Sequence, residues 1–413
     1  LPALAQRPTH PRGLRGGAVS ARARVHRSLA LGLVVVLSAL SGAACDQTVI
    51  VGRVDGDPDG GAGCLMPLLA DDLAVGSDHV CVVHDGAVQC WGGGESGQRC
   101  DGATTNTPRP TSPTGFDTYS AVYAGGLNTC LRRSDGTLVC CGNNFDGTLG
   151  DGGSAGSSRP VEVIGSVEEA AMGFSSVYAT RAAGTLTVWG ANGDGQLGLG
   201  TGSVSEAVRT PTDVAGVAFE EVAASTAHAC AVDAAGALFC TGTNTANELG
   251  IPLLTSAADF TAVPAPTPFR SVSAGRRLSC AIGTGGDLYC WGRNEPTMIA
   301  GHVGDVDEPT RVGSESDYES VSVGFEHVCA IRTGGRLFCW GNGGDGRLGF
   351  EATATDTPTE VTPGVAYRTV RASFAFTCAI RSVDSAVVCF GSDEAGQLAG
   401  GDGSPAAPIC LDP

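Results

Sequence analysis

The sequence contains no lysine, so all 25 of its basic residues are arginines. This absence excludes lysine Schiff-base chemistry, Ser-Lys nucleophiles and the lysine of a phosphate-binding loop. Aromatic residues are also scarce at 6%, and charged residues make up only 16% of the 413 positions. Glycine is abundant, with 62 residues, and the hydrophobic content is 42%. This balance is typical of short strands joined by tight turns and predicts an all-β globular protein.

An excess of positive over negative charge occurs at the start of the chain. Residues 1–44 hold six arginines and no acidic residue, whereas the remainder holds 19 arginines against 43 carboxylates, a formal balance of −24. A nucleic-acid partner requires a basic stripe, and the sequence has none beyond its first 44 residues. We therefore expect no nucleic-acid partner, and an acidic surface that favours basic or metal-bearing partners.

The first 44 residues have the pattern of a secretory signal peptide. Several arginines precede an uncharged apolar stretch at residues 29–40, and small residues then lead to Cys45. The stretch is short for a membrane span, so we expect export, with a permanent transmembrane helix as the alternative. The run ending in Cys45 resembles a bacterial lipobox, which implies lipidation of this cysteine and a cell-envelope location, although Gly42 departs from that pattern. Ordinary cleavage and an extracellular location are the alternative.

Beyond the leader, the chain divides into a short polar run and a long repetitive part. Residues 45–63 are rich in glycine and aspartate and lack a hydrophobic period, which predicts a flexible tether. Residues 64–413 contain one phrase seven times, each copy ending in glycine at intervals of 48 to 52 residues. These glycines are Gly92, Gly142, Gly190, Gly242, Gly292, Gly341 and Gly391. A period near 50 indicates one repeat domain, whose units cannot bury a core alone.

Each repeat has the pattern of about four strands. Before the glycine lies a hairpin, as in residues 80–83, the turn at residues 85–86, and residues 88–91. After the glycine come a glycine-rich turn, a variable loop, and another short strand that follows a proline such as Pro160 or Pro358. This arrangement is one propeller blade, so the sequence predicts an all-β, seven-bladed β-propeller.

Two phrases carry a resemblance to a known family: Trp189-Gly190-x-Asn192-x-x-Gly195-Gln196-Leu197-Gly198, and His327-x-Cys329-Ala330-Ile331 with Gly335-x-Leu337-x-x-Trp340-Gly341. They resemble repeats of the regulator of chromosome condensation family, a seven-bladed β-propeller, over roughly residues 65–413. Thr241 and Phe390 replace the tryptophan, and residues 295–299 lack the glycine-leucine turn. The resemblance offers two precedents, a nuclear nucleotide-exchange factor and secreted propellers that bind and inhibit β-lactamases. The expected export and the acidic charge favour the second precedent, a secreted binding propeller.

Twelve of the 17 cysteines fall at equivalent positions on the two arms of the repeat hairpin. The pairs are Cys81 with Cys90, Cys130 with Cys140, Cys230 with Cys240, Cys280 with Cys290, Cys329 with Cys339, and Cys378 with Cys389. Antiparallel arms bring facing Cβ atoms within bonding reach, and an exported chain meets an oxidising compartment, so we expect six disulfides. Repeat three has Tyr178 and Val188 instead, a joint loss that pairing predicts. Inert buried thiols are the alternative; zinc is disfavoured because no CxxC spacing occurs.

Four further cysteines of this domain suggest two more pairs. A propeller closes by joining its first and last strands, and Cys64 and Cys410 occupy neighbouring repeat positions at that seam. We therefore expect a Cys64–Cys410 clasp. Cys100 and Cys141, on adjacent blades, give a second pairing hypothesis.

Candidate catalytic groups recur at the repeat period or lack a catalytic pattern. His79, His228 and His327 share one repeat position, which predicts a packing role because a catalytic group is needed only once. The adjacent acids at residues 168–169 and 220–221 are expected on alternate strand faces and in solvent. No Ser-His-Asp elbow or HExxH motif occurs in the sequence, so we expect no catalytic residue, no cofactor and no metal site.

The sequence thus predicts a non-enzymatic, exported interaction scaffold, monomeric and tethered to a membrane by its lipid anchor alone. It would bind a protein or glycan through variable propeller loops, such as residues 101–115 and 199–216. The alternative is a secreted carbohydrate-active hydrolase or lyase with its site at one end of the propeller channel. Unrepeated acidic and histidine side chains at that end would favour the enzyme, whereas repeated packing residues would oppose it.

Overall fold

The computed structural model describes residues 66–115, 117–200, 207–295, 298–401, 403–405 and 407–410. The chain divides into two units, Leu1–Gly52 and Arg53–Pro413, and all described residues belong to the second. The expected signal peptide, the tether and the lipidation site Cys45 lie outside the described residues. Among the described residues, no helix is long and apolar enough to cross a membrane.

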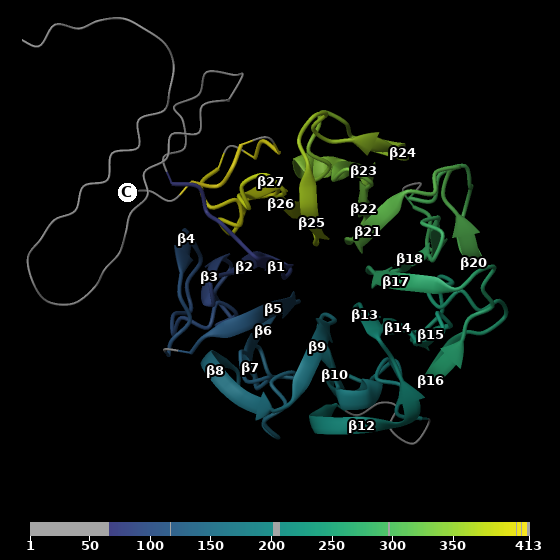
Figure 1. The fold of residues 1–413 in the computed structure, drawn as a ribbon. Helices are drawn as coiled ribbons and strands as arrows, with labels where there is room; N and C mark the ends of the chain where they lie inside the picture. Colours follow the sequence, from purple (N-terminus) through teal and green to yellow (C-terminus); the bar gives the residue numbers. More distant parts are fainter. Residues whose placement is uncertain are drawn as a thin grey trace, which may run out of the picture. The chain divides into compact units, whose positions relative to one another are not determined.

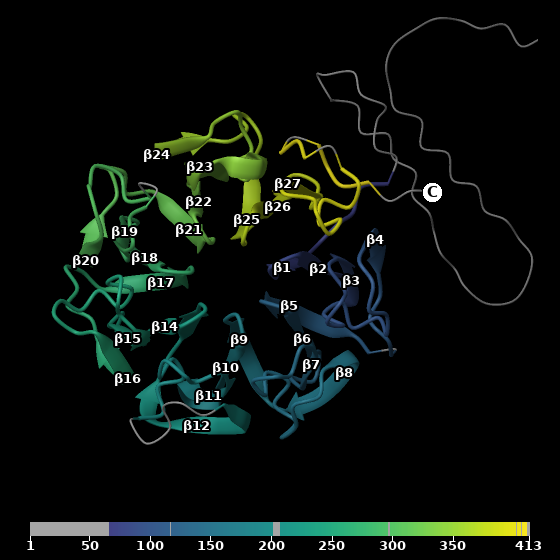
Figure 2. The same cartoon turned by 180° about the vertical axis from the view of Figure 1, so that it is seen from behind.

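Seven antiparallel sheets form a ring, and this confirms the predicted seven-bladed all-β fold (Figures 1 and 2). Each blade places its strands side by side in sequence order, and the first strand of each blade contacts the first strand of its neighbours around the centre. The elements of blades 1 to 3 are β1 (Asp72–Val75), β2 (His79–His84), β3 (Ala87–Gly92), β4 (Thr107–Thr111); β5 (Tyr119–Gly125), β6 (Asn128–Arg133), β7 (Leu138–Gly142), β8 (Ser157–Ile164); β9 (Val167–Met172), β10 (Ser176–Arg181), the 3-10 turn η1 (Ala182–Gly184), β11 (Thr185–Gly190) and β12 (Val208–Ala218).

Blades 4 to 7 repeat this order with small variations. Their elements are β13 (Glu221–Ala224), β14 (His228–Val232), β15 (Leu238–Thr243), β16 (Ser256–Ala262); β17 (Phe269–Ala274), β18 (Leu278–Gly283), β19 (Leu288–Gly292), β20 (Val306–Arg311); β21 (Tyr318–Val323), β22 (His327–Arg332), β23 (Arg336–Asn342), the 3-10 turn η3 (Gly344–Gly346), β24 (Ala354–Glu360); β25 (Tyr367–Ala372), β26 (Phe376–Arg381) and β27 (Val387–Gly391). Blade 7 has three strands of its own, and the two ends of the described chain complete it.

The seven periodic glycines each end the third strand of a blade in a conformation that other residues avoid. Their φ angles lie between +92° and +122°, and a Cβ at any of them would lie 2.2–2.6 Å from a backbone carbonyl oxygen. That oxygen belongs to the turn between the first and second strands of the same blade, and the residue after the glycine donates its N–H to it over 2.7–3.1 Å. Only glycine combines a positive φ with this close backbone approach, which explains the period.

The six predicted cysteine pairs all lie at disulfide distance, with S–S separations of 1.98–2.13 Å. In each blade the two cysteines face each other directly across the second and third strands; Cys81, for example, is the register partner of Cys90. In blade 3 the corresponding pair is Tyr178 and Val188, and the buried Tyr178 hydroxyl donates to the carbonyl of Gln196 over 2.7 Å. The cross-strand position therefore holds either a disulfide or a packed aromatic.

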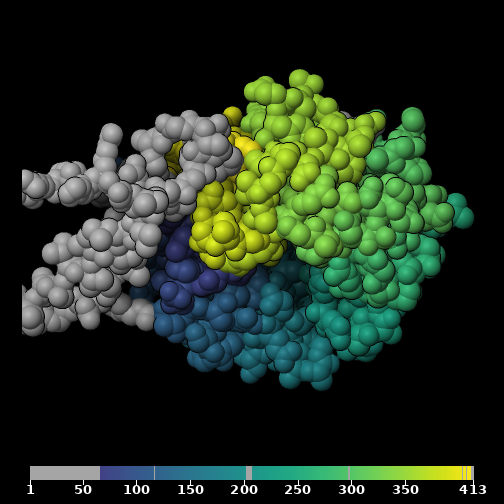
Figure 3. Space-filling view, turned by 45° about the horizontal axis from the view of Figure 1, so that its top comes forward, coloured from purple at the N-terminus to yellow at the C-terminus, as the bar shows by residue number. Residues whose placement is uncertain are grey.

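The ring closes through both ends of the described chain, which meet at blade 7. Leu68 donates its N–H to the Ile409 carbonyl and accepts the N–H of Val387, which lies in β27. Leu68 and Ile409 are buried against Trp91 of blade 1 and side chains of blade 7. Figure 3 shows the purple first blade against the yellow last one. Cys410 is disulfide-bonded, and its predicted partner Cys64 lies outside the described residues.

Candidate functional site

The recurring histidines lie between blades, in the packing position that the sequence predicts. His79, His228 and His327 are fully buried, and each Nε2 lies 2.8 Å from a hydroxyl on the next blade. These hydroxyls, of Thr129, Ser279 and Thr377, donate their own proton to a backbone carbonyl, so Nε2 donates to them. Burial lowers the pKa of His228 to about 4 and that of His327 to about 3. All three imidazoles are interblade hydrogen-bond donors, and those of His228 and His327 are neutral.

The contact between blades 1 and 2 is built differently from the other interblade contacts. In three of the other contacts an aromatic residue at the end of the third strand packs on a glycine of the preceding blade: Trp189 on Gly150, Trp291 on Gly250, and Phe390 on Gly349. Here Cys141 takes the aromatic position and Cys100 the glycine position, with a positive φ of 61°, and the two form a disulfide. The structure thus places the second hypothetical pair at bonding distance, 5.5 Å between Cα atoms.

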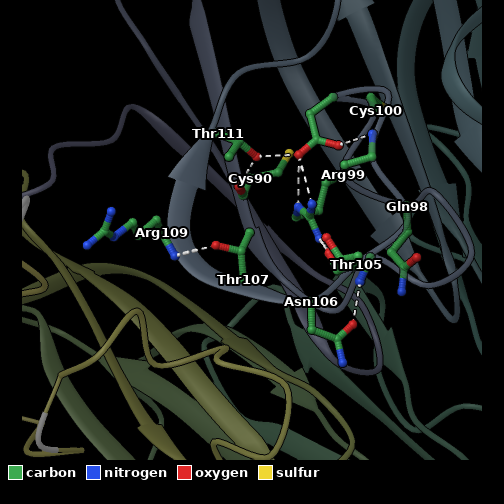
Figure 4. A network of polar contacts seen from close by, with 12 residues as sticks. Cys90, Gln98, Arg99, Cys100, Thr105, Asn106, Thr107, Arg109 and Thr111 are labelled. Atoms are coloured by element: carbon green, nitrogen blue, oxygen red, sulfur yellow. Dashed lines mark hydrogen bonds and ion pairs between the residues drawn. The ribbon is translucent and has the colours of Figure 1, made fainter.

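Beside this disulfide, Arg99 stands where the other blades have leucine or isoleucine. It is 1% exposed, and its Nε and Nη2 donate to Asp101 Oδ2 over 3.1 and 2.9 Å (Figure 4). Thr111 Oγ1 also donates to Asp101 Oδ2, over 2.8 Å, and Arg99 Nη1 bonds to the Thr105 carbonyl. The segment 101–115, expected as a variable binding loop, is therefore fixed by buried polar contacts and contains β4. Much of the second expected loop, 199–216, is strand β12, and residues 201–206 lie outside the described chain.

Hydrogen bonds between turns define two faces of the ring. The turns between first and second strands, and those between third and fourth strands, bond to each other in every blade and so lie on one side, which we call face A. The turns between second and third strands bond to the segments that enter the next blade, as Gly86 O does to Tyr119 N, and form face B. Any cluster of unrepeated side chains can now be assigned to a face.

Exposed apolar side chains gather on face A. Of the seven large hydrophobic side chains that are exposed among the described residues, five lie in face A turns. They are Phe145 (76% exposed), Phe174 (43%), Leu253 (104%), Val303 (102%) and Phe374 (46%). Val383 is on face B, and Met66 precedes the closure segment. We call these five residues the apolar set. Phe174 and Phe374 share one turn position with Phe325, and the other four blades have serine, glycine, threonine or arginine there.

A stacked cluster lies on face A at the mouth of the central cavity. The Arg276 guanidinium carbon is 4.1 Å from the centre of the Phe325 ring, whose centre is 4.0 Å from that of Phe374. These three side chains come from consecutive turns of blades 5, 6 and 7, which line one cavity together with Phe174 of blade 3. Cation–π and ring contacts hold the cluster in one arrangement. The mouth thus presents aromatic surface with one exposed guanidinium.

The central cavity has a volume of about 530 Å³ and carries unrepeated charges on the first strands of its blades. Asp72, Glu169 and Glu221 stand at equivalent positions of blades 1, 3 and 4, whereas the other blades have alanine, serine or threonine there. Arg371 of blade 7 lines the same cavity. Asp72 Oδ2 accepts the N–H of Val122 over 3.1 Å, and Glu221 Oε1 accepts that of Val272 over 3.3 Å. The ring thus gathers carboxylates from distant positions in the sequence.

The surrounding protein changes the acidity of these groups. Desolvation in the ring raises the pKa of Glu221 to about 7, against the lowering effects of the Val272 N–H and of Arg371. Desolvation also raises the pKa of Glu169, although 62% of this side chain is accessible to water. The expectation that these adjacent acids lie in solvent thus holds for Glu169 by its exposure, and it is wrong for Glu221, which is half-buried.

The cavity has one of the two features that would favour an enzyme, unrepeated acidic side chains, and its described lining lacks the other, histidine. It contains unrepeated carboxylates, but none of its described lining residues is a histidine. Among the described residues, the one close group of three acidic, histidine or cysteine side chains is Asp71, His84 and Asp85, near face B and outside the cavity. The channel carboxylates are thus more widely spaced than the ligands of one metal ion. These carboxylates could have been found in the sequence, because they depart from the repeat at one position of the first strand.

Comparison with known proteins agrees with this architecture. Models of the regulator of chromosome condensation repeat match residues 183–232, 269–295 and 318–347. The ultraviolet-B receptor UVR8 of Arabidopsis thaliana is 29% identical over 187 residues, 43% of this chain and 42% of the receptor. The human E3 ubiquitin-protein ligase HERC2 is 28% identical over 174 residues, 40% of this chain and 4% of the ligase. The chain thus spans less than half the length of these relatives.

Solved structures resemble the whole ring at low sequence identity. Human WBSCR16 aligns with a TM-score of 0.66 at 20% identity, over 74% of this chain and 84% of that protein. Prp20p from Saccharomyces cerevisiae, described with its binding properties to Gsp1p and histones, aligns with a TM-score of 0.65 at 19% identity, over 79% of this chain and 83% of that protein. These likenesses show the fold, a seven-bladed propeller.

Proposed function

We propose, on the premise that this chain is a seven-bladed propeller of regulator of chromosome condensation repeats, that it is a non-enzymatic, exported scaffold that binds a protein or glycan partner through face A. The observation that carries the proposal is the apolar set, which places five of the seven exposed large hydrophobic side chains of the described residues on one face. Exposed aromatic side chains on a rigid support are typical of recognition surfaces.

The rigidity of the ring supports the same function. Six hairpin disulfides and the Cys100–Cys141 disulfide hold the blades, so the face A turns can present side chains with little loss of conformational entropy on binding. The acidic balance of −24 beyond residue 44 favours a partner with basic groups around an apolar contact. Binding would thus combine apolar contact at the centre with charge attraction at the edge.

Disulfide content supports export, because such bonds persist in oxidising compartments. Lipidation at Cys45, a cell-envelope location and a monomeric state complete the proposal. Replacing Cys45 by alanine should shift the protein from the membrane to the soluble fraction of the envelope without affecting the hairpin disulfides. A membrane fraction that is unchanged in this variant would contradict the lipid tether while leaving the face A proposal intact.

The test of the binding face is site-specific photo-crosslinking in intact cells. A photoreactive p-benzoylphenylalanine replaces Phe374 on face A or, as the matched control, Val383 on face B, which is 85% exposed. We expect a discrete adduct from position 374 and none from position 383, and its sensitivity to protease or glycosidase assigns the partner class. Equal adducts from both positions, or none from position 374, would contradict binding through face A.

A second candidate function, a carbohydrate-active hydrolase or lyase, is favoured by one observation, the Glu221 carboxyl with its raised pKa beside other carboxylates. A general acid of pKa about 7 facing an ionised carboxylate is the arrangement that glycoside hydrolysis uses. Incubation with a panel of soluble glycans should release reducing ends from the wild type and not from Glu221→Gln if this function holds. No release from any glycan leaves the scaffold as the better account.

A further inference from the structure

The central cavity combines an acidic interior with a hydroxyl group that lacks a partner. Tyr123 lines the cavity from β5 and is 8% exposed, and no group lies within hydrogen-bond distance of its hydroxyl, although burial and the nearby Glu169 raise the pKa of that hydroxyl. The hydroxyl groups of Ser271 and Ser320, on β17 and β21, are likewise buried without a partner. Of these three residues, only Tyr123 lines the cavity. A buried polar group without a partner costs free energy, so the Tyr123 hydroxyl indicates that a ligand completes its hydrogen bonds.

Charge selects the sign of that ligand. Asp72, Glu169, Glu220 and Glu221 line the cavity against the guanidinium groups of Arg276 and Arg371, so carboxylates outnumber guanidiniums and the net charge is negative once Glu221 is ionised. Asp72 accepts two backbone N–H groups and Glu221 accepts one, which leaves lone pairs of both carboxylates for a donor. The balance of −24 beyond residue 44 adds a long-range field of the same sign. An anionic ligand is therefore disfavoured, and a cation with N–H donors is favoured.

The walls between the mouth and these charges select the shape. They consist mainly of small apolar side chains of the first strands: Ala74, Ala124, Ala171, Ala223, Ala224, Ala274 and Ala372. The mouth adds the aromatic rings of Phe174 and Phe374. A volume of about 530 Å³ lies within the range of small-molecule sites. Methylene groups would lie against the alanines while nitrogen atoms reach the carboxylates and the Tyr123 hydroxyl.

We propose that the central cavity binds a linear aliphatic polyamine, whose ammonium groups are held by Asp72, Glu169 and Glu221 and by the Tyr123 hydroxyl. This site lies inside the ring and is independent of the partner proposed for face A. The wide spacing of the carboxylates suits several ammonium groups on one chain rather than one metal ion. No bond is made or broken in the complex.

Binding should depend on pH through Glu221. The groups that face it are Glu169 of β9, Arg371 of β25, and Arg270 and the Val272 N–H of β17. Because its pKa is about 7, Glu221 is largely neutral at pH 6 and ionised at pH 8. Polyamine binding therefore strengthens as pH rises from 6 to 8, and Glu221→Gln should remove this dependence.

Calorimetric titration of the whole mature protein with spermidine tests the proposal, with Mg²⁺ at matched ionic strength as the comparison cation. We expect saturable spermidine binding that Glu169→Gln with Glu221→Gln weakens at least about tenfold. The control Glu168→Gln with Glu319→Gln removes two charges from the same kind of strand outside the cavity and should leave the affinity within about twofold. Circular dichroism verifies that each variant is folded.

Tyr123→Phe separates a ligand site from mere negative charge. Removing a hydroxyl that lacks a partner should raise the thermal midpoint of the free protein and still weaken spermidine binding about threefold or more. The proposal is overturned if spermidine binds no better than Mg²⁺, if the cavity variants bind as the wild type does, or if Tyr123→Phe leaves the affinity unchanged.

Discussion

Replacing His228 by leucine together with Ser279 by valine should remove one source of acid sensitivity from the ring without breaking it. The variant copies a contact that the protein already uses, because Leu278 packs with Val328 at the next interface. Within the chain, a histidine at this position always faces threonine or serine on the following blade, and every other residue there faces valine or alanine. The hydrogen-bonded and apolar pairs are therefore alternative solutions of one interface.

The magnitude follows from proton linkage. His228 has a pKa of about 4 in the folded protein against 6.5 when exposed, so the unfolded chain binds more protons between these values. Above pH 6.5 the imidazole is neutral in both states, and the folded protein keeps its full stability. As pH falls from 6.5 toward 4, the unfolded chain binds the proton more readily, and the folded protein loses stability. With about 1.4 kcal/mol for each pKa unit, about 2 kcal/mol of unfolding free energy is lost between pH 7 and pH 5. The leucine–valine pair has no such dependence.

The assay is denaturant unfolding of wild type and variant at pH 7 and pH 5. Since the same leucine–valine pair is accommodated at the Leu278–Val328 interface, stability at pH 7 should change by less than about 1.5 kcal/mol. The loss from pH 7 to pH 5 should be about 2 kcal/mol smaller in the variant, and His327→Leu with Thr377→Val should behave alike because burial also lowers the pKa of His327. An acid-induced loss equal to that of the wild type would refute the assignment of a neutral, buried imidazole.

Two further predictions concern the features that build the ring. Gly190→Ala should cost at least about 3 kcal/mol of unfolding free energy, because the residue has a φ of +104° and its Cβ would lie 2.3 Å from the Ser175 carbonyl oxygen. The control Gly193→Ala has open space around the added Cβ and should cost less than about 1 kcal/mol. Equal losses in denaturant unfolding would contradict the backbone explanation of the period. Cys100→Ser with Cys141→Ser opens a crosslink between positions 41 apart and should cost about 4 kcal/mol, measured in the same way; a loss below about 1 kcal/mol would show that this bond constrains the unfolded chain little.

Features confined to one repeat were readable in the sequence. Glycines that close the third strand, cysteines that face each other across a hairpin and the joint loss at Tyr178 and Val188 all depend on residues within a dozen positions, so their period and spacing predicted the fold. The carboxylates of the cavity depend on the ring itself. Glu169 and Glu221 lie 52 positions apart, and only closure of seven blades brings their strands around one space. Their adjacent acids suggested solvent exposure, because local spacing carries no information about the centre of a propeller.

Residues that depart from the repeat are of two kinds: those with a partner inside the chain and those without one. The second kind indicates where a ligand or a partner molecule binds. At the blade interfaces the departures come in pairs that satisfy each other: His228 with Ser279, Cys100 with Cys141, Arg99 with Asp101. Such pairs leave nothing for a ligand, and their role is structural. On face A and in the cavity some departures lack a counterpart within the described chain, as in the exposed ring of Phe145 and the buried hydroxyl of Tyr123. A free-energy cost that the fold leaves uncompensated is most simply offset by a molecule from outside the chain.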